Sequence, residues 1–377
     1  MTIIFDASNI GGGGGLTHLK EILNCYNYKF KIILIAQNKI LTQIPSYPFL
    51  TKLNHVFLEK SLLHRLFFQI FLIDKFIPKK SIVYSITGDF LGKHKPLVSM
   101  STNMLLYERK IWFEIRQFRE ILRFWINYHK QKISFNNSIG IIFISKYAKE
   151  YISNCLNLKG KNITIINHGV SQRFVKDIKK QKSIIEYTFL NPFKFIYVST
   201  IHVYKNQWNI VEAIDKLRMQ GYPVELHIVG GVIFEPAGKK LNSTIKKIDP
   251  KNEFIHNHGH IEYEEIDKLY NRTDGIIFAS TCENMPIILI ESMSSGIPIV
   301  CSEKDPMPEF LKNNGFYFDA HNIESIVTTI KIFLNNPEKR YINSKNALTE
   351  SFKYTWDDTN TKIIEFLIYN YRLSLKY

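Results

Sequence analysis

The stretch "GIIFASTCENMPIILIESMSSGIPIVCS", Gly275 to Ser302, contains one complete strand–helix–strand unit. Its first six and last six residues are small or β-branched and almost continuously apolar, which is typical of strands buried on both faces of a parallel sheet. Between them, Pro286 fits the first helical position, with the N-cap near Asn284 or Met285, and Gly296 can end the helix. The stretch therefore predicts a parallel sheet covered by helices.

Apolar runs of the same kind recur along the chain, at 2–5, 31–36, 81–85, 96–100, 139–145, 194–200 and 224–230. Amphipathic helical patterns separate them, as in "LTHLKEIL" at 16–23. At 377 residues the chain is long enough for two domains. Because the alternation occurs in both halves, we predict two doubly wound α/β domains, with the polar and basic stretch 171–193 as their linker.

The charge balance is strongly basic, with 49 Lys and Arg against 34 Asp and Glu and a net charge of +15. Such a field attracts phosphates in nucleotides, nucleic acid or an anionic leaflet, but it also fits a merely lysine-rich surface. The basic residues are spread out and no nucleic-acid-recognition motif is found, so nucleic acid is not an expected partner. Four cysteines without a C-x-x-C pair argue against a disulfide framework or a zinc site.

The N-terminal segment "MTIIFDASNI" lacks the basic region of a signal peptide, and no apolar run reaches the ~20 residues of a membrane span. We therefore expect a cytoplasmic protein. The segment 108–132 has basic residues around one apolar helical stripe, which consists of Ile111, Ile115, Phe118, Leu122, Trp125 and His129. This pattern fits peripheral docking on the inner face of an anionic membrane, and it equally fits a core helix with a solvated basic face.

Two carboxylates flank the start of the helix in the opening stretch. Glu283 precedes it, and Glu291 lies 291 − 283 = 8 residues later. An ionised carboxylate only accepts hydrogen bonds and can hold a pair of hydroxyls, while helix N-terminal amides attract phosphate. The spacing fits a nucleotide sugar bound across the helix start. Two solvated glutamates are the alternative, but the apolar neighbours of Glu291 argue against it.

Two further segments follow predicted strands, where open parallel sheets bind their ligands. The glycine run "NIGGGGG", 9–15, opens a helix and is interpreted as a phosphate-contacting loop, with a flexible linker as the alternative. Lys205 follows the strand at 194–200 and could neutralise a leaving diphosphate, or it could be an ordinary surface lysine.

Three alternating histidines, His256, His258 and His260, would share one face of a strand. Because no carboxylate or cysteine accompanies them at ligand spacing in the sequence, we interpret them as surface histidines. No metal site is predicted.

The segment "CENMPIILIESMSSGIPIV" resembles the E-x7-E signature of the family-4 retaining glycosyltransferases of the GT-B fold, the glycosyl transferases group 1. Four more segments resemble parts of the same family pattern: "VSTIHVYKNQWNIVEAI", "INHGV", "FISKYAKEYI" and "YTWDDT". The resemblance implies two Rossmann-like domains of doubly wound parallel sheets that face a cleft. An acceptor-binding domain would span 1–175 and a nucleotide-sugar-binding domain 185–356, and a helix at 357–377 would pack back on the first domain.

The resemblance also implies roles for individual residues. Glu291 would bind the ribose hydroxyls and Glu283 the donor-sugar hydroxyls, while Lys205 would stabilise the departing diphosphate. Lys205 and Glu283 are thus the expected catalytic residues. The other implied donor-binding residues are Gly13, Gly14, His260, Ile261, Asn284, Met285 and Ile287.

Two positions depart from the family pattern. Thr200 stands where an arginine is usual, so Lys205 would carry more of the charge stabilisation. Asn103 is the polar residue near the position where many members have a histidine, which makes it the acceptor-side candidate.

The expected function is retaining transfer of a hexose, of mannose, glucose or N-acetylhexosamine type, from a nucleotide-diphospho-sugar to a glycan or lipid-linked acceptor. Surface polysaccharide, lipopolysaccharide O-antigen or capsule synthesis would be its setting. No D-x-D motif occurs, so neither a metal nor another cofactor is expected. The alternatives are a nucleotide-sugar epimerase or hydrolase of the same fold, or a basic nucleic-acid-binding protein.

Overall fold

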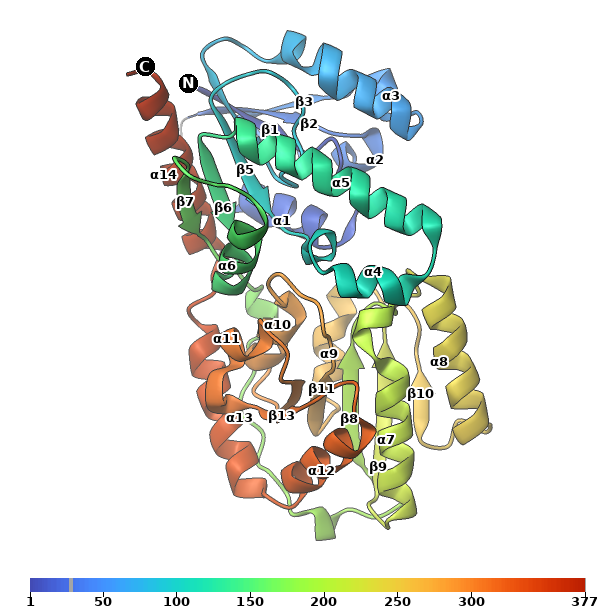
Figure 1. Cartoon of the computed structure of the whole chain (residues 1–377). Helices are drawn as coiled ribbons and strands as arrows, with labels where there is room; N and C mark the ends of the chain where they lie inside the picture. The colour runs from blue at the N-terminus through green and yellow to red at the C-terminus, as the bar shows by residue number, and fades with distance from the viewer. Residues whose placement is uncertain (27–29, 377) are drawn as a thin grey trace. The chain divides into compact units, whose positions relative to one another are not determined.

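The computed structural model describes residues 1–26 and 30–376, and the chain divides into two compact units (Figure 1). Unit 1 consists of Met1–Gly169 and Thr355–Tyr377, and unit 2 of Val170–Tyr354. In each unit, a parallel sheet carries the core and helices cover it.

Unit 1 contains a seven-stranded sheet in the order β3-β2-β1-β4-β5-β6-β7, in which every pairing is parallel. Its strands are β1 (Thr2–Asp6), β2 (Lys31–Ile35), β3 (Leu50–Leu53), β4 (Ser81–Ser85), β5 (Leu97–Ser101), β6 (Gly140–Phe143) and β7 (Asn162–Ile165). Its helices are α1 (Gly13–Asn24), α2 (Asn38–Leu41), α3 (Leu62–Phe67), α4 (Arg109–Ile115), α5 (Phe118–Asn137), α6 (Lys146–Cys155) and α14 (Trp356–Ser374).

Unit 2 contains a six-stranded parallel sheet in the order β10-β9-β8-β11-β12-β13. Its strands are β8 (Phe193–Val198), β9 (Val224–Val229), β10 (Ile255–Asn257), β11 (Gly275–Phe278), β12 (Ile299–Ser302) and β13 (Phe316–Phe318). Its helices are α7 (Gln207–Met219), α8 (Glu235–Ile248), α9 (Ile266–Tyr270), α10 (Ile287–Ser294), α11 (Met307–Leu311), α12 (Ile323–Leu334) and α13 (Pro337–Ser351).

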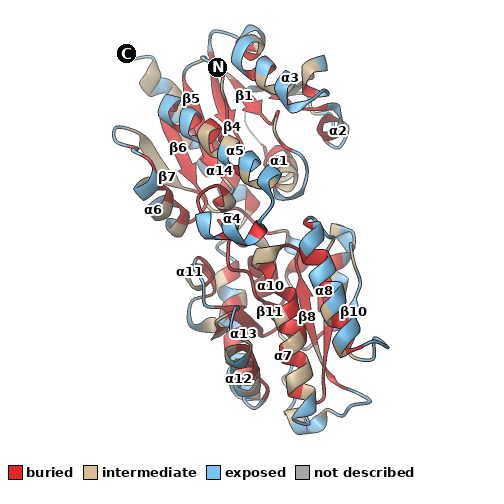
Figure 2. Cartoon of the chain, turned by 45° about the vertical axis from the view of Figure 1, so that its right-hand side comes forward, coloured by how far each residue is buried: buried red, intermediate tan, exposed pale blue. Residues whose placement is uncertain are grey.

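The central strands form the cores of both sheets, and Figure 2 shows β1, β4, β5, β8 and β11 coloured as buried. Continuous burial on both faces is what their apolar, β-branched composition predicts. The prediction of two doubly wound α/β domains is therefore confirmed.

The C-terminal helix α14 packs on unit 1 through buried polar contacts as well as apolar ones. The Asn360 amide donates a 2.6 Å hydrogen bond to the Cys25 carbonyl, and the Thr359 hydroxyl donates a 2.8 Å bond to the Asn167 carbonyl. These contacts join the last helix to segments more than 190 residues earlier in the chain.

The stretch 171–193, predicted as a linker, instead lies within unit 2 and packs on it. The Lys176 amide donates to the Ser294 carbonyl at 3.1 Å. The Lys179 ammonium donates to the carbonyls of Asn271 and Thr273 at 2.6 and 2.9 Å. A backbone amide and a lysine side chain of this stretch thus donate hydrogen bonds at the C-terminal ends of α10 and α9, a role that a polar composition does not reveal.

The segment 108–132 does not form the single helix that its pattern predicts. It divides into α4 and α5 at Arg116, which adopts a left-handed conformation with φ 51°. As a result Ile111 is buried, whereas Phe118 and Trp125 are 78% and 51% exposed. Although α5 is 20 residues long, neither it nor any other described helix has the length and apolarity needed to cross a membrane.

Candidate functional site

A buried ion pair in unit 2 joins two of the predicted site residues. Lys205 ends a short 3-10 turn (Val203–Lys205) that follows β8, and Glu283 follows β11, the neighbouring strand. The Lys205 ammonium contacts Glu283 Oε1, and the two side chains are only 7% and 16% exposed. Because both charges are largely removed from water, each depends on the other or on a bound ligand.

The backbone around Lys205 is fixed by its neighbours. The Tyr197 hydroxyl donates a 2.6 Å hydrogen bond to the Lys205 carbonyl. Asn206 adopts a left-handed conformation, φ 53°, and its amide donates to the Ala279 carbonyl at 3.0 Å. The turn that carries the ammonium is thus fixed to the end of β11, which reduces the reorganisation needed when a charged ligand binds.

Helix α10 begins one residue later than the sequence predicts. Pro286 has φ −80° and ψ 81°, so it is the N-cap and not the first helical residue. The Ile287 amide, predicted to contact a ligand, donates to the Met285 carbonyl at 3.0 Å in this structure. Asn284 and Met285 are buried beside it.

Glu291 is a buried carboxyl in the middle of α10, 1% exposed. The Tyr263 hydroxyl donates a 2.5 Å hydrogen bond to its Oε1. Burial raises the pKa of Glu291 to about 7, although the Tyr263 hydrogen bond and the Arg173 charge favour the ionised form. A buried carboxyl that titrates near neutral pH is typical of a functional position.

Arg173 contacts the ring of Tyr263 and was not predicted from the sequence to be a site residue. Its guanidinium carbon is 3.8 Å from the centroid of the Tyr263 ring, a cation–π geometry. Its Nε and one terminal nitrogen are buried without a hydrogen-bond partner among the described residues. The side chains of Arg173, Tyr263 and Glu291 therefore form a cluster. Within it, the positive charge of Arg173 lies near the buried carboxyl of Glu291.

We predict that Tyr263→Phe raises the pKa of Glu291 above 7 by roughly one pH unit, because the ionised carboxylate loses a hydroxyl donor. A carbon-detected NMR titration would measure this, with Glu291→Gln identifying the resonance. An unchanged pKa would show that the hydroxyl does not stabilise the charge.

His260 and Ile261 lie in the loop between β10 and the turn Tyr263–Glu265. The His260 ring is 71% exposed, with its Nε2 3.5 Å from Glu262. The prediction that no carboxylate accompanies the other alternating histidines is wrong, because the β9–β10 register brings Glu225 beside His256.

The candidate residues of unit 1 occupy two places. Gly13 and Gly14 form the first turn of α1, where Gly13 has φ 59°. A Cβ added at either glycine would meet nothing within 4 Å, so the backbone there is accessible to close approach.

Asn103 is exposed and accepts a 3.0 Å hydrogen bond from the Leu105 amide. It lines a pocket of about 480 Å³ in unit 1 together with Asp89, Lys130 and Arg123. The Asp89–Lys130 ion pair, at 2.8 Å and largely buried, was missed in the sequence because its partners are 41 residues apart.

Comparison with known proteins finds a family whose pattern these residues match. Residues 177–349 match the sequence model of the family "Glycosyl transferases group 1". The matched segment lies wholly within unit 2. Lys205, Glu283 and Glu291 lie within the matched residues, whereas Arg173 precedes them.

Curated relatives match a part of this chain. One is sulfoquinovosyl transferase SQD2 of Arabidopsis thaliana, 30% identical over 110 residues that cover 28% of this chain and 22% of that protein. Another is O-antigen chain mannosyltransferase B of Escherichia coli, 26% identical over 106 residues that cover 28% of each. The matches span less than a third of the length of either relative.

Solved structures extend the likeness to the whole fold. Anabaena Alr3699/HepE, in complex with UDP and glucose, has a TM-score of 0.73 at 18% identity, with 97% of this chain and 99% of that chain covered. Sucrose-phosphate synthase from Thermosynechococcus elongatus has a TM-score of 0.76 at 12% identity, with full coverage of both chains. The predicted GT-B fold, with two Rossmann-like parallel-sheet domains, is confirmed.

Proposed function

We propose that this chain is a metal-independent, retaining glycosyltransferase that takes a hexose from a nucleotide-diphospho-sugar. The observation that carries the proposal is that the buried carboxyl of Glu291 and the largely buried Lys205–Glu283 ion pair both lie within the matched residues. It is supported by two relatives named as sulfoquinovosyl and mannosyl transferases, and by a neighbouring structure that holds UDP-glucose.

Each residue would have a distinct task. Glu291, once ionised, accepts hydrogen bonds from the two ribose hydroxyls, and Tyr263 orients it. Glu283 binds hydroxyls of the donor sugar and holds Lys205 in place until the diphosphate arrives. Lys205 then stabilises the negative charge that develops on the departing diphosphate.

In the transfer itself, the bond from the sugar C1 to the diphosphate oxygen breaks, and the acceptor oxygen bonds to C1 on the same face. The acceptor proton passes to the departing phosphate, which leaves from that same face. The protein's contribution is positioning and charge stabilisation. With Thr200 where the family usually has arginine, that stabilisation rests mainly on Lys205.

For the acceptor we propose a glycan or a lipid-linked saccharide of a surface polysaccharide, bound by unit 1. The Asn103 pocket supports this, since Asp89, Lys130 and Arg123 offer both acceptors and donors for sugar hydroxyls. The exposed aromatic residues Phe118 and Trp125 lie on the basic helix α5, which fits a lipid carrier at a membrane surface.

We predict that the protein floats with liposomes that contain anionic lipid and that added salt weakens this association, because the basic residues of α5 attract the charged headgroups. Liposomes of neutral lipid are the control. No association at low salt would contradict the membrane part of the proposal.

The donor is tested by a thermal-shift screen over UDP-, GDP-, dTDP- and ADP-sugars, followed by product analysis. A true donor at 100 times its Kd should add about 2.7 kcal/mol of stability. Sugar release or isomerisation without an acceptor would favour the epimerase or hydrolase alternative. If none of the nucleotide sugars shifts the melting temperature, the proposed function is wrong.

A further inference from the structure

A second cluster of ionisable side chains lies at the edge of the unit 2 sheet, on β9 and the edge strand β10. Parallel pairing places His256 of β10 directly beside His227 of β9. Glu225 lies two residues before His227, so both point to the same face of the sheet. Leu226 and Ile228, which alternate with them, are fully buried on the opposite face.

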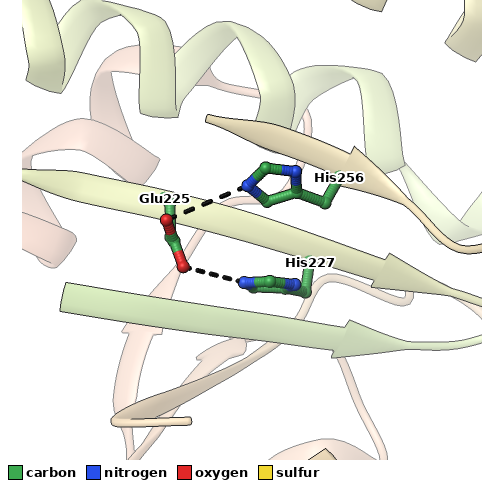
Figure 3. Close-up of side chains that lie close together, drawn as sticks. All are labelled: Glu225, His227 and His256. Atoms are coloured by element: carbon green, nitrogen blue, oxygen red, sulfur yellow. Dashed lines mark hydrogen bonds and ion pairs between the residues drawn. The ribbon is translucent and has the colours of Figure 1, made fainter. Parts of the chain in front are cut away.

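The ligand atoms of these three side chains converge. Glu225 Oε1 is 2.9 Å from His227 Nε2, and Glu225 Oε2 is 3.8 Å from His256 Nε2 (Figure 3). One ligand atom from each residue lies within 4.8 Å of the others. Bonds of 2.0–2.1 Å around a tetrahedral ion separate neighbouring ligands by about 3.4 Å. One of the two carboxylate–imidazole distances is shorter than this and the other longer, and each involves a different Glu225 oxygen.

We propose that Glu225, His227 and His256 bind a divalent transition-metal ion, with zinc as the best fit. One carboxylate and two imidazoles are a nitrogen–oxygen ligand set that suits zinc better than the oxygen-seeking magnesium or calcium. Three protein ligands leave one position for water.

A fourth residue, His258, can set the tautomer of His227. Its Nε2 lies 2.9 Å from His227 Nδ1. If Nδ1 carries the proton and donates it to His258, the lone pair on His227 Nε2 faces Glu225 and is available to the ion. An outer hydrogen bond of this kind is the usual support of a metal-bound histidine.

Lys194 is the competing cation. Its ammonium is 3.0 Å from Glu225 Oε1, so an ion would take over Oε2, which faces His256, or displace the lysine. The cluster is partly accessible, with the His227 and His256 side chains 22% and 31% exposed. The site shares no residue with Lys205, Glu283 and Glu291, and an ion there would connect the three-residue edge strand β10 to β9.

The test uses full-length protein without a polyhistidine tag, stripped of metal by a chelator. Calorimetry with Zn²⁺ and visible absorption with Co²⁺ should both show one equivalent bound, with a Kd on the order of 10⁻⁶ M or tighter. Zn²⁺ should also raise the Tm of the chain.

The variants separate this site from scattered surface histidines. His227→Ala and His256→Gln should each weaken Zn²⁺ binding at least about tenfold, and His258→Ala about tenfold through the tautomer. His321→Ala removes an exposed histidine outside the cluster and should change nothing. His256→Gln serves where His227→Ala fails to fold. Unchanged binding in His256→Gln, or no stoichiometric binding by the parent protein, would overturn the proposal.

Discussion

Lys205→Met lowers turnover by about 10²–10³ in the proposed mechanism and leaves donor affinity within a few-fold, because the ammonium acts mainly on charge that develops as the diphosphate departs. The effect is large because the Lys205 side chain is only 7% exposed, and a charge in a poorly solvated site interacts strongly. Steady-state kcat and KM with the donor found by the screen would measure it.

The same substitution also leaves Glu283 without its partner, which costs stability independently of catalysis. Breaking a fully buried pair costs about 3–5 kcal/mol, and the 16% exposure of Glu283 reduces this. The double variant Lys205→Met, Glu283→Gln removes both charges and should recover most of the stability but none of the turnover. If turnover recovers with stability, Lys205 has only a structural role.

A matched control comes from an exposed ion pair of the same unit. Lys216 on α7 contacts Glu324, and both side chains are well exposed. Lys216→Met should therefore change stability by less than about 1 kcal/mol and leave turnover unchanged.

The apolar runs of the sequence predict the central strands, and the four edge strands are not among them. β3, β7, β10 and β13 end the two sheets and are three or four residues long. An edge strand pairs on one side only and is less buried, as in β7, where every residue is half-buried. Its composition therefore lacks the continuous apolar run by which a central strand is recognised.

The candidate site also combines residues from local sequence motifs with a residue that only long-range packing brings close. Lys205, Glu283 and Glu291 belong to contiguous motifs that follow strands, so their positions could be predicted. Arg173 lies in a stretch interpreted as linker, and only the packing of that stretch on unit 2 brings it to Tyr263. No local pattern predicts such a contact.

The cluster on β9 and β10 and the break at Arg116 have a similar explanation. Glu225 meets His256 through strand register, which depends on how two separate segments pair. A left-handed conformation at a residue other than glycine, as at Arg116, has no reliable sequence signal.

Glu291→Gln should make the ligand-free protein more stable at alkaline pH. The carboxyl pKa is raised from 4.5 to about 7, so the folded chain holds a proton that the unfolded chain releases between these values. The stabilisation from the protonated carboxyl is complete below pH 4.5 and is lost as the pH rises through 7. Glutamine imitates the protonated form at every pH, so above pH 7 the variant should gain up to about 3 kcal/mol.

The same variant should lose about 1.5–3 kcal/mol of nucleotide affinity, roughly a 10- to 150-fold rise in Kd, because a charged acceptor of ribose hydroxyls becomes neutral. Wild-type affinity should increase from pH 6 to pH 8 as Glu291 ionises, and the affinity of the variant should not follow this slope. Calorimetry at both pH values and chemical unfolding would measure the two effects, with Glu338→Gln, an exposed glutamate of α13, as the control. Replacing a residue that serves only the structure lowers the stability of the protein. Replacing a residue that serves ligand binding raises the stability of the protein and lowers its affinity for the ligand. Equal nucleotide affinities in variant and wild type would remove Glu291 from the donor site.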